Sequence, residues 1–289
     1  MAPVHPEVFS FTSTLHHDTY PAVAKASHKG RTVFITGASK GIGRATAISF
    51  AKAGAETIII AARSSLTEVE TEIIAAAKEV GASPRVIKLV LEVTDEKSVA
   101  NAAAEIQRTV GKVDILINNA GYLEKWLPIA ESDPIEWWKT WEINLKGLYL
   151  VTRAILPLVL QSETKTIINL SSIGAHLVSR GASGYQISKL AVIRFTEFIV
   201  EEYGEQGVVA ISVHPGGVLT DLAANMPEYM QQVLVDTPEL AGDSLAWLTQ
   251  EKQQWLNGRY LSVTWDMPEL LARKDEIVNG DKLKVRLAI

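Results

Sequence analysis

The sequence of 289 residues contains no cysteine, and this absence excludes disulfides, cysteine-ligated zinc and cysteine nucleophiles. No charge of one sign dominates: 28 Lys and Arg face 33 Asp and Glu, which gives no sign of a surface for nucleic acid or acidic membranes. The longest apolar runs, such as 148–160, are interrupted by Arg153 and Pro157 and are too short to span a bilayer. Residues 1–20 lack the basic and apolar segments of a signal peptide. We therefore expect a cytoplasmic protein with neither a nucleic-acid nor a membrane partner.

Four of the six histidines lie near the N-terminus, at His5, His16, His17 and His28. Their spacing is mixed and no cluster of carboxylates accompanies them, so we expect no metal site. We interpret residues 1–30, which are polar and irregular, as an arm that packs on the surface of the main domain.

The sequence does contain a regular alternation of β-rich and helical stretches. The predicted strands are 31–36, 56–62, 83–93, 112–117, 165–172, 207–217 and 258–265. The predicted helices are 44–54, 65–81, 95–111, 133–160, 184–204 and 239–250. This order predicts a single α/β domain with the Rossmann fold, a doubly wound parallel sheet of about seven strands with helices on both faces. The domain spans 31–265, with a predicted lid at about 216–238, and a charged C-terminal extension covers 266–289.

A glycine-rich turn, GASKGIG at 37–43, stands between the first strand and the first helix. Glycines there permit a tight turn and let the backbone approach a pyrophosphate, which the free amides and dipole of the helix N-terminus attract. This strand–turn–helix context predicts a dinucleotide site.

The second strand ends at Ala61 and Ala62 and is followed by Arg63. An NAD site places an acidic residue at this strand end, where it binds the ribose 2′-hydroxyl. Arg63, together with Lys40 in the glycine turn, instead suits a 2′-phosphate, because a guanidinium matches phosphate oxygens. These residues favour NADP(H), with NAD(H) as the alternative if both cations are merely solvated.

The stretch from Ser172 to Lys189 carries the residues most suited to catalysis. Tyr185 and Lys189 are four positions apart, so a helix places both on one face. A free tyrosine titrates near pH ~10, and stabilising its phenolate near neutrality takes about 3–4 kcal/mol, much of which a close ammonium can supply. Ser172 is then a hydrogen-bond donor to a carbonyl oxygen that becomes an alkoxide. Taken alone, the Tyr–Lys spacing also describes an ordinary surface pair.

With these pieces in order, residues 30–265 resemble the classical branch of the short-chain dehydrogenase/reductase family. The motifs that carry the resemblance are TGASKGIG from Thr36, NNAG at 118–121, Asn144, Ser172, Tyr185, Lys189, and PGGVLT at 215–220. Six segments in the right order make a chance match negligible. The arm and the tail lie outside this core and suggest a fungal-type subgroup.

The resemblance implies a catalytic tetrad of Asn144, Ser172, Tyr185 and Lys189. Lys189 would bind the nicotinamide ribose and depress the pKa of Tyr185, Tyr185 would transfer the proton, and Asn144 would hold a relay water. The implied cofactor residues are Gly37, Ser39, Lys40, Gly41, Ile42, Gly43, Arg63, Glu92, Val93, Asn119, Ala120, Gly121, Tyr185, Lys189, Pro215, Gly216, Val218 and Thr220. Many members have Asp where this chain has Glu92, so the adenine contact of Glu92 is open.

The expected function is hydride transfer between NADP(H) and a carbonyl or secondary alcohol of a hydrophobic small molecule such as a polyketide or terpenoid. The expected substrate pocket consists of Trp126, Ser172, His176, Leu177 and Tyr185, although His176 suits a core position equally well. Alternatives are an NAD-dependent alcohol dehydrogenase, a sugar-nucleotide epimerase, which the spacing of the glycine turn disfavours, and a non-catalytic dinucleotide sensor. The family resemblance implies a homodimer or homotetramer formed through 133–160 and 185–204.

Overall fold

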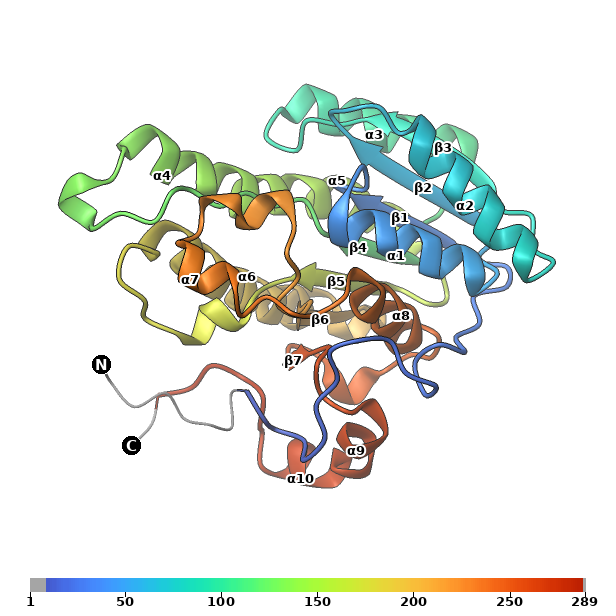
Figure 1. Ribbon diagram of the computed structural model, residues 1–289. Coiled ribbons are helices and arrows are strands. Elements are labelled where there is room, and N and C mark those ends of the chain that lie inside the picture. Colours follow the sequence, from blue (N-terminus) through green and yellow to red (C-terminus); the bar gives the residue numbers. More distant parts are fainter. Residues whose placement is uncertain (1–8, 288–289) are drawn as a thin grey trace.

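The computed structural model describes residues 9–287 and contains one sheet of seven parallel strands (Figure 1). The strands are β1 (Thr32–Thr36), β2 (Thr57–Ala62), β3 (Arg85–Val90), β4 (Ile115–Asn118), β5 (Thr166–Leu170), β6 (Val209–His214) and β7 (Tyr260–Ser262). Their order in the sheet is β3-β2-β1-β4-β5-β6-β7. The order reverses between β1 and β4, and ligands of such sheets bind beyond the carboxyl ends of the strands at that point. The predicted fold class is confirmed.

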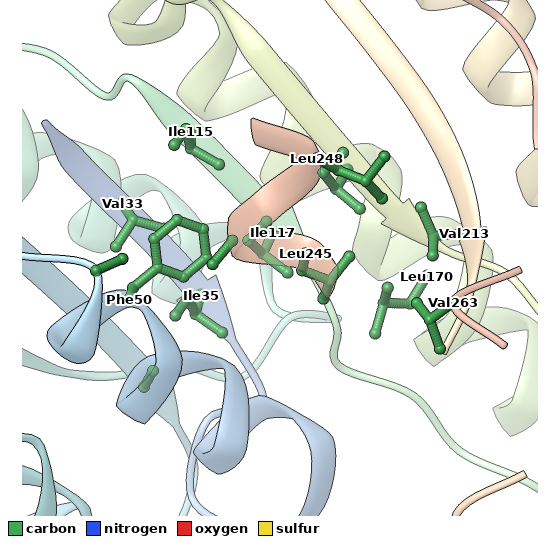
Figure 2. Packing of buried hydrophobic residues seen from close by; sticks show 14 of the residues in the cluster. Val33, Ile35, Phe50, Ile115, Ile117, Leu170, Val213, Leu245, Leu248 and Val263 are labelled. Carbon is green, nitrogen blue, oxygen red and sulfur yellow. The ribbon is translucent and has the colours of Figure 1, made fainter. Parts of the chain in front are cut away.

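Helices cover both faces of the sheet. The main helices are α1 (Gly41–Lys52), α2 (Thr67–Glu79), α3 (Glu96–Thr109), α4 (Pro134–Trp141), α5 (Leu148–Leu160), α6 (Ser183–Tyr203) and α8 (Pro238–Thr249). One face packs α1, α2 and α8 against the sheet, through residues such as Phe50 and Leu245 (Figure 2). The other face packs α3, α5 and α6. Strands in the centre are buried on both sides, which is why their sequences are continuous apolar runs rather than alternating ones.

The predicted helix at 133–160 is one continuous helix with an irregular middle. A π-helical segment, η3 (Glu142–Gly147), lies between α4 and α5. The whole helix, Pro134–Leu160, has 27 residues and is by length and composition apolar enough to cross a membrane, although the apolar run 148–160 alone is shorter. In its most apolar window 61% is buried inside the protein, which is the pattern of a core helix.

The last strand is shorter than predicted because the chain after Ser262 turns toward the N-terminal arm. The amide of His16 donates to the carbonyl of Thr264 at 2.8 Å, and Leu15 forms an isolated antiparallel bridge with Trp265. The arm continues along α8, where buried His28 bonds the Ala246 carbonyl at 2.7 Å. The first part of the chain is thereby tied to elements more than two hundred residues away.

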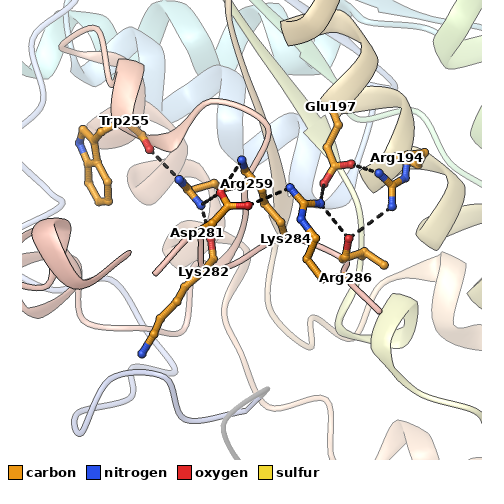
Figure 3. Close-up of polar contacts among 9 residues, drawn as sticks. Arg194, Glu197, Trp255, Arg259, Asp281, Lys282, Lys284 and Arg286 are labelled. Atoms are coloured by element: carbon orange, nitrogen blue, oxygen red, sulfur yellow. Dashed lines mark hydrogen bonds and ion pairs between the residues drawn. The ribbon is translucent and has the colours of Figure 1, made fainter. Parts of the chain in front are cut away.

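The C-terminal extension folds over the outer edge of β7. It contains two short helices that the sequence pattern did not predict, α9 (Met267–Ala272) and α10 (Lys274–Asn279). The amide of Tyr260 donates to the Leu283 carbonyl at 2.8 Å, so the tail covers the free edge of the sheet. Figure 3 shows the ionic contacts that hold it: Arg286 lies 3.1 Å from both Glu197 and Asp281, and Arg259 lies 3.4 Å from Asp281.

Candidate active site

A cavity of about 1180 Å³ opens beyond the carboxyl ends of the central strands. The predicted site residues that line it are Gly37, Ser39, Lys40, Gly41, Ile42, Gly43, Arg63, Glu92, Val93, Asn119, Ala120, Gly121, Trp126, Ser172, Leu177, Tyr185, Lys189, Pro215, Gly216, Val218 and Thr220. Asn144 and His176 lie behind its wall. A set that comes from seven separate segments of the chain therefore meets in one place.

The glycine turn is packed too closely for side chains. A Cβ on Gly43 would lie 2.4 Å from both the Asn119 amide nitrogen and the Gly37 carbonyl oxygen, and Gly41 has a φ of +55°. Asn119 from the NNAG motif locks the turn by donating to the carbonyls of Thr36 at 2.8 Å and Gly37 at 3.0 Å. The helix α1 begins here without a side-chain cap and without an acidic residue in its first turn. The residues of the turn line the cavity, so the uncapped amides at the start of α1 fit a pyrophosphate there.

Two cationic side chains, Arg63 after β2 and Lys40 in the glycine turn, line the cavity, and each lies beside a carboxylate. Arg63, whose side chain is 68% exposed, lies 3.3 Å from Glu92. Lys40 lies 2.6 Å from Asp221 at the start of the lid. Burial acts to raise the pKa of Glu92, but hydrogen bonds from Thr94 and the Arg63 charge outweigh it and lower that pKa. Glu92 is thus the ion-pair partner of Arg63, and its contact with adenine stays a prediction.

Ser172, Tyr185 and Lys189 converge on the opposite side of the cavity. The Lys189 ammonium lies 5.7 Å from the centre of the Tyr185 ring and donates to the Leu170 carbonyl at 2.8 Å. Its burial lowers the pKa of Lys189 to about 8. This arrangement places a phenol, a hydroxyl group and a cation in one wall of the cavity.

The expected lowering of the Tyr185 pKa is not found. Burial raises the pKa of Tyr185, a hydrogen bond with Ser172 acts against this, and the charge of Glu124 raises it further. Lys189 does not offset these effects because its ammonium is turned to the Leu170 carbonyl. The phenol is consequently held in its protonated form.

The two neighbouring serines have different roles in the structure. The hydroxyl of Ser171 is buried and donates to the Lys189 carbonyl at 2.8 Å. The hydroxyl of Ser172 accepts from the Gly174 amide at 3.0 Å and hydrogen-bonds with Tyr185. The geometry therefore favours Ser172 as the group that faces a substrate oxygen.

Asn144 lies in the π-helical segment η3, where π turns often mark functional positions. Its amide donates to the Tyr122 carbonyl at 2.9 Å and to the Ser188 hydroxyl at 3.0 Å, and its oxygen accepts from the Tyr122 amide at 2.8 Å. All its bonding groups are occupied, so the side chain braces the loop after β4 against α6.

His176 does not line the cavity, contrary to the expectation that it belongs to the substrate pocket. It ends the short helix η4 (Ile173–His176), and its ring packs edge-on against Tyr260 with 4.4 Å between centroids. Burial lowers its pKa, so the ring is neutral. The core alternative for this histidine is the one that the structure supports.

Several lining residues carried no signal in the sequence. From the arm come Phe9, Leu15 and His17, which reach the cavity only because the arm crosses beside the lid. His214 lines it at the end of β6. Glu124, which lies behind the wall in contact with the α6 N-terminus, is a single acid in an irregular loop. Neither periodicity nor a motif could have identified these residues.

The chain is similar to known short chain dehydrogenases along most of its length. A family model for short chain dehydrogenase matches residues 31–231. A short chain dehydrogenase of Monascus purpureus is 57% identical over 284 residues, covering 97% of each chain. One from Emericella variicolor is 45% identical over 280 residues, covering 96% of this chain and 97% of its own. A solved short chain dehydrogenase of Shigella flexneri complexed with NADP has a TM-score of 0.72 at 25% identity, over 83% of this chain and 99% of its own.

Proposed function

Because the chain belongs to the short-chain dehydrogenase/reductase family, whose members are oxidoreductases that use a nicotinamide dinucleotide, we propose that it is an NADP(H)-dependent carbonyl reductase or alcohol dehydrogenase. The observation that carries the proposal is that Ser172, Tyr185 and Lys189 share one cavity with the glycine turn. A cofactor held by the turn would therefore extend toward the group that transfers the proton.

The cofactor site is proposed to divide into three parts. The turn at 37–43 would hold the pyrophosphate, Arg63 and Lys40 the 2′-phosphate, and Lys189 with the segment 215–220 the nicotinamide half. The tight packing of Gly43 against Asn119 supports the first part, because only a bare backbone fits there. The exposure of Arg63 beside the cavity supports the second.

In the proposed mechanism Tyr185 donates its proton to the carbonyl oxygen during reduction, and Ser172 donates a hydrogen bond to the same oxygen. A bound nicotinamide supplies the hydride for the carbonyl carbon. Lys189 would orient the nicotinamide ribose. Asn144 would act by bracing α6, and the main chain of its π segment would hold any relay water.

We propose a hydrophobic substrate of medium size, such as a fungal secondary metabolite of polyketide or terpenoid type. Apolar lid side chains on the cavity, including Met226, Met230 and Val233, support this choice. The lid itself contains η6 (Asp221–Asn225) and the short helix α7 (Glu228–Gln231). Its return at Asp236 pairs with Val218 in an isolated parallel bridge, so its two ends lie together.

A cytoplasmic homodimer or homotetramer is part of the proposal. Large apolar side chains are exposed on the outer helices, with Trp138 60%, Phe198 54% and Tyr149 44% accessible. Exposed groups of this kind suit a subunit contact. Light scattering during gel filtration distinguishes a dimer or tetramer from a monomer, and a monomer at micromolar concentration contradicts this part.

The test of the function is cofactor binding followed by turnover. Energy transfer from the seven tryptophans to NADPH and to NADH measures the two affinities. We expect NADPH to bind at least about tenfold tighter, a gap of about 1.4 kcal/mol, and hydrophobic ketones to be reduced. NAD(H) is the second candidate, because Arg63 already has Glu92 as its partner. Binding of neither cofactor would refute the enzyme assignment, and binding without turnover of any ketone or alcohol would favour the non-catalytic sensor.

A further inference from the structure

Glu124 is a buried carboxylate in direct contact with the start of the helix that carries Tyr185. The side chain is 3% exposed. One carboxylate oxygen accepts the backbone amide of Tyr185 at 3.0 Å, and the other accepts the hydroxyl of Thr140 at 2.7 Å. Both donors are neutral groups. The negative charge thus lies inside the protein, against the main chain of the residue proposed to transfer the proton.

This contact takes the place of a missing helix cap. The residue before α6 is Ala182, which offers no side-chain acceptor to the first amides of the helix. Glu124 supplies that acceptor from a loop 61 positions earlier in the chain. The indole nitrogen of Trp137 adds a bond to the Ser183 hydroxyl at 3.0 Å, so α4 also holds this helix end.

The local backbone is shaped around the carboxylate. A Cβ on Gly184 would lie 2.6 Å from the Glu124 oxygen and 3.1 Å from the ring of Trp137. Only glycine at this position lets the acid approach the helix so closely. The approach is therefore a specific feature of the site and not the incidental burial of a side chain.

Capping alone does not require a charge. The amide oxygen of a glutamine would accept the Tyr185 amide equally well, and its nitrogen could donate to Thr140. The Thr140 hydroxyl would then donate to the Glu136 carbonyl, which already lies 3.2 Å away. A buried carboxylate is more costly to desolvate than an amide. The two hydrogen bonds of Glu124 therefore do not by themselves account for a charged side chain at this position.

We propose that Glu124 is a positioning residue for Tyr185, whose carboxylate fixes the start of α6 and whose charge keeps the phenol in its proton-donating form, so that the site favours carbonyl reduction. This inference rests on the proposed function, in which Tyr185 transfers the proton. It assigns Glu124 and Ser172 opposite effects on the phenol. The Glu124 charge opposes the phenolate, as burial does, whereas the Ser172 hydrogen bond favours it.

The groups around Tyr185 support this assignment. Burial raises the pKa of Tyr185 first, the Ser172 hydrogen bond acts against this, and the Glu124 charge raises it again. Lys189 faces it from α6 at 5.7 Å from the ring centre. From η4, His176 is neutral because burial lowers its pKa, and from α4 the side chains that face the α6 N-terminus, Trp137 and Thr140, carry no charge.

The experiment compares variants that remove the charge with one that keeps it. Glu124→Gln and Glu124→Ala lose the charge, whereas Glu124→Asp retains it on a shorter side chain. The Tyr185 midpoint is read from the pH-dependent ultraviolet absorbance of tyrosinate with saturating NADP⁺. Subtracting the same titration of Tyr185→Phe isolates this residue from the other tyrosines. Asp114→Asn is the matched control, because Asp114 is an equally buried carboxylate that accepts a backbone amide, from Thr32 at 2.7 Å.

We expect Glu124→Gln to lower the Tyr185 midpoint by about one pH unit, which corresponds to about 1.4 kcal/mol of interaction between the Glu124 charge and the phenolate. The alkaline limb of ketone reduction with NADPH should move down by the same amount. Glu124→Asp should keep the wild-type midpoint within about 0.3 units while lowering Tm, and Asp114→Asn should lower Tm only. If the glutamine variant does not fold, the alanine variant provides the same midpoint.

The two variants that lose the Glu124 charge decide whether that charge acts on Tyr185. A folded Glu124→Gln or Glu124→Ala protein with the wild-type midpoint and alkaline limb overturns the proposal and makes Glu124 a structural cap. Lys189, with a pKa of about 8, also titrates in alkaline solution, so the absorbance difference, and not the rate alone, assigns the group. If Tyr185→Phe retains full turnover, the proposed function fails, yet the absorbance titration still measures the effect of Glu124 on Tyr185.

Discussion

The two walls of the cavity differ in how they are held. The wall that carries Tyr185 and Lys189 is tied by buried hydrogen bonds within the segment 118–190, such as that from Asn144 to Ser188. The wall formed by the lid and the arm is tied by partly exposed contacts between these two segments, such as His17 with Asp236 at 2.5 Å. Buried bonds hold atoms to a fraction of an ångström, whereas exposed ion pairs contribute little free energy. We therefore expect the chemistry to reside on the first wall, and closure over the substrate and substrate selectivity on the second.

The variant Tyr185→Phe is the strongest test of the catalytic role that we assign to the first wall. We expect kcat/KM to fall about 10²- to 10⁴-fold, because the general acid is lost, while the affinity for NADPH changes less than about twofold. Steady-state kinetics and the fluorescence titration measure the two quantities. Turnover close to that of the wild type would contradict the proposal that Tyr185 is the general acid and that catalysis takes place at this wall.

The paired variants Ser172→Ala and Ser171→Ala test the wall at neighbouring residues. Loss of a hydrogen bond to the developing oxyanion typically costs about 10²- to 10³-fold in kcat, so we expect an effect of this size from Ser172→Ala. Ser171→Ala loses the bond to the Lys189 carbonyl, which should lower the free energy of unfolding by about 1 kcal/mol with a smaller effect on kcat. The reverse ranking in kcat would exchange the roles of the two serines.

Lys189 makes the stability of the first wall depend on pH. Burial lowers its pKa from 10.5 to about 8, so between these values the unfolded chain binds more protons than the folded one. Stability should therefore rise with pH across this window. Relative to Lys189→Met, the wild type should gain on the order of 3 kcal/mol, as measured by urea denaturation at both ends of the window. A difference in unfolding free energy between the two proteins that does not change with pH would mean that the Lys189 ammonium is solvated.

Arg63→Ala sharpens the comparison at the cofactor end. We expect the Kd for NADPH to rise about tenfold, about 1.4 kcal/mol, and the Kd for NADH to stay within about twofold. The reason is that the guanidinium has a partner in the 2′-phosphate and none in a 2′-hydroxyl. Lys52→Ala, at the opposite end of α1, is the matched control for loss of an exposed cation. Equal losses for the two cofactors would argue for NAD.

The smallest expected effects belong to the second wall. His17→Ala removes one contact of Asp236, whereas Asp236→Asn also weakens the acceptor of the Gly217 amide at 2.5 Å. We expect substrate KM to rise about two- to fivefold in His17→Ala, as for an exposed pair worth less than about 1 kcal/mol, and more in Asp236→Asn, with kcat preserved in both. Faster proteolysis within the lid would accompany the change. A large drop in kcat would place part of the chemistry on the arm.

The fold and the first wall could be predicted because their signals are local. Continuous apolar strands, a glycine turn between strand and helix, and the Tyr–Lys spacing each lie within a short stretch of sequence. The parallel order of the sheet then brings the strand ends together without further information. Even there the direction of the Tyr185 pKa was wrong, because it depends on where the Lys189 ammonium points and on Glu124, which belongs to another segment.

The amino-acid sequence by itself determined the family and the α/β class, and it predicted the residues proposed to transfer a proton, since these follow from residue types at fixed short spacings. Only the tertiary structure decided that the arm borders the cavity, that the tail covers the edge of β7, and that His176 faces Tyr260. It alone decided that Glu124 contacts the amide of Tyr185. Contacts between segments distant along the chain leave no periodicity, because their geometry arises when the sheet and helices pack together.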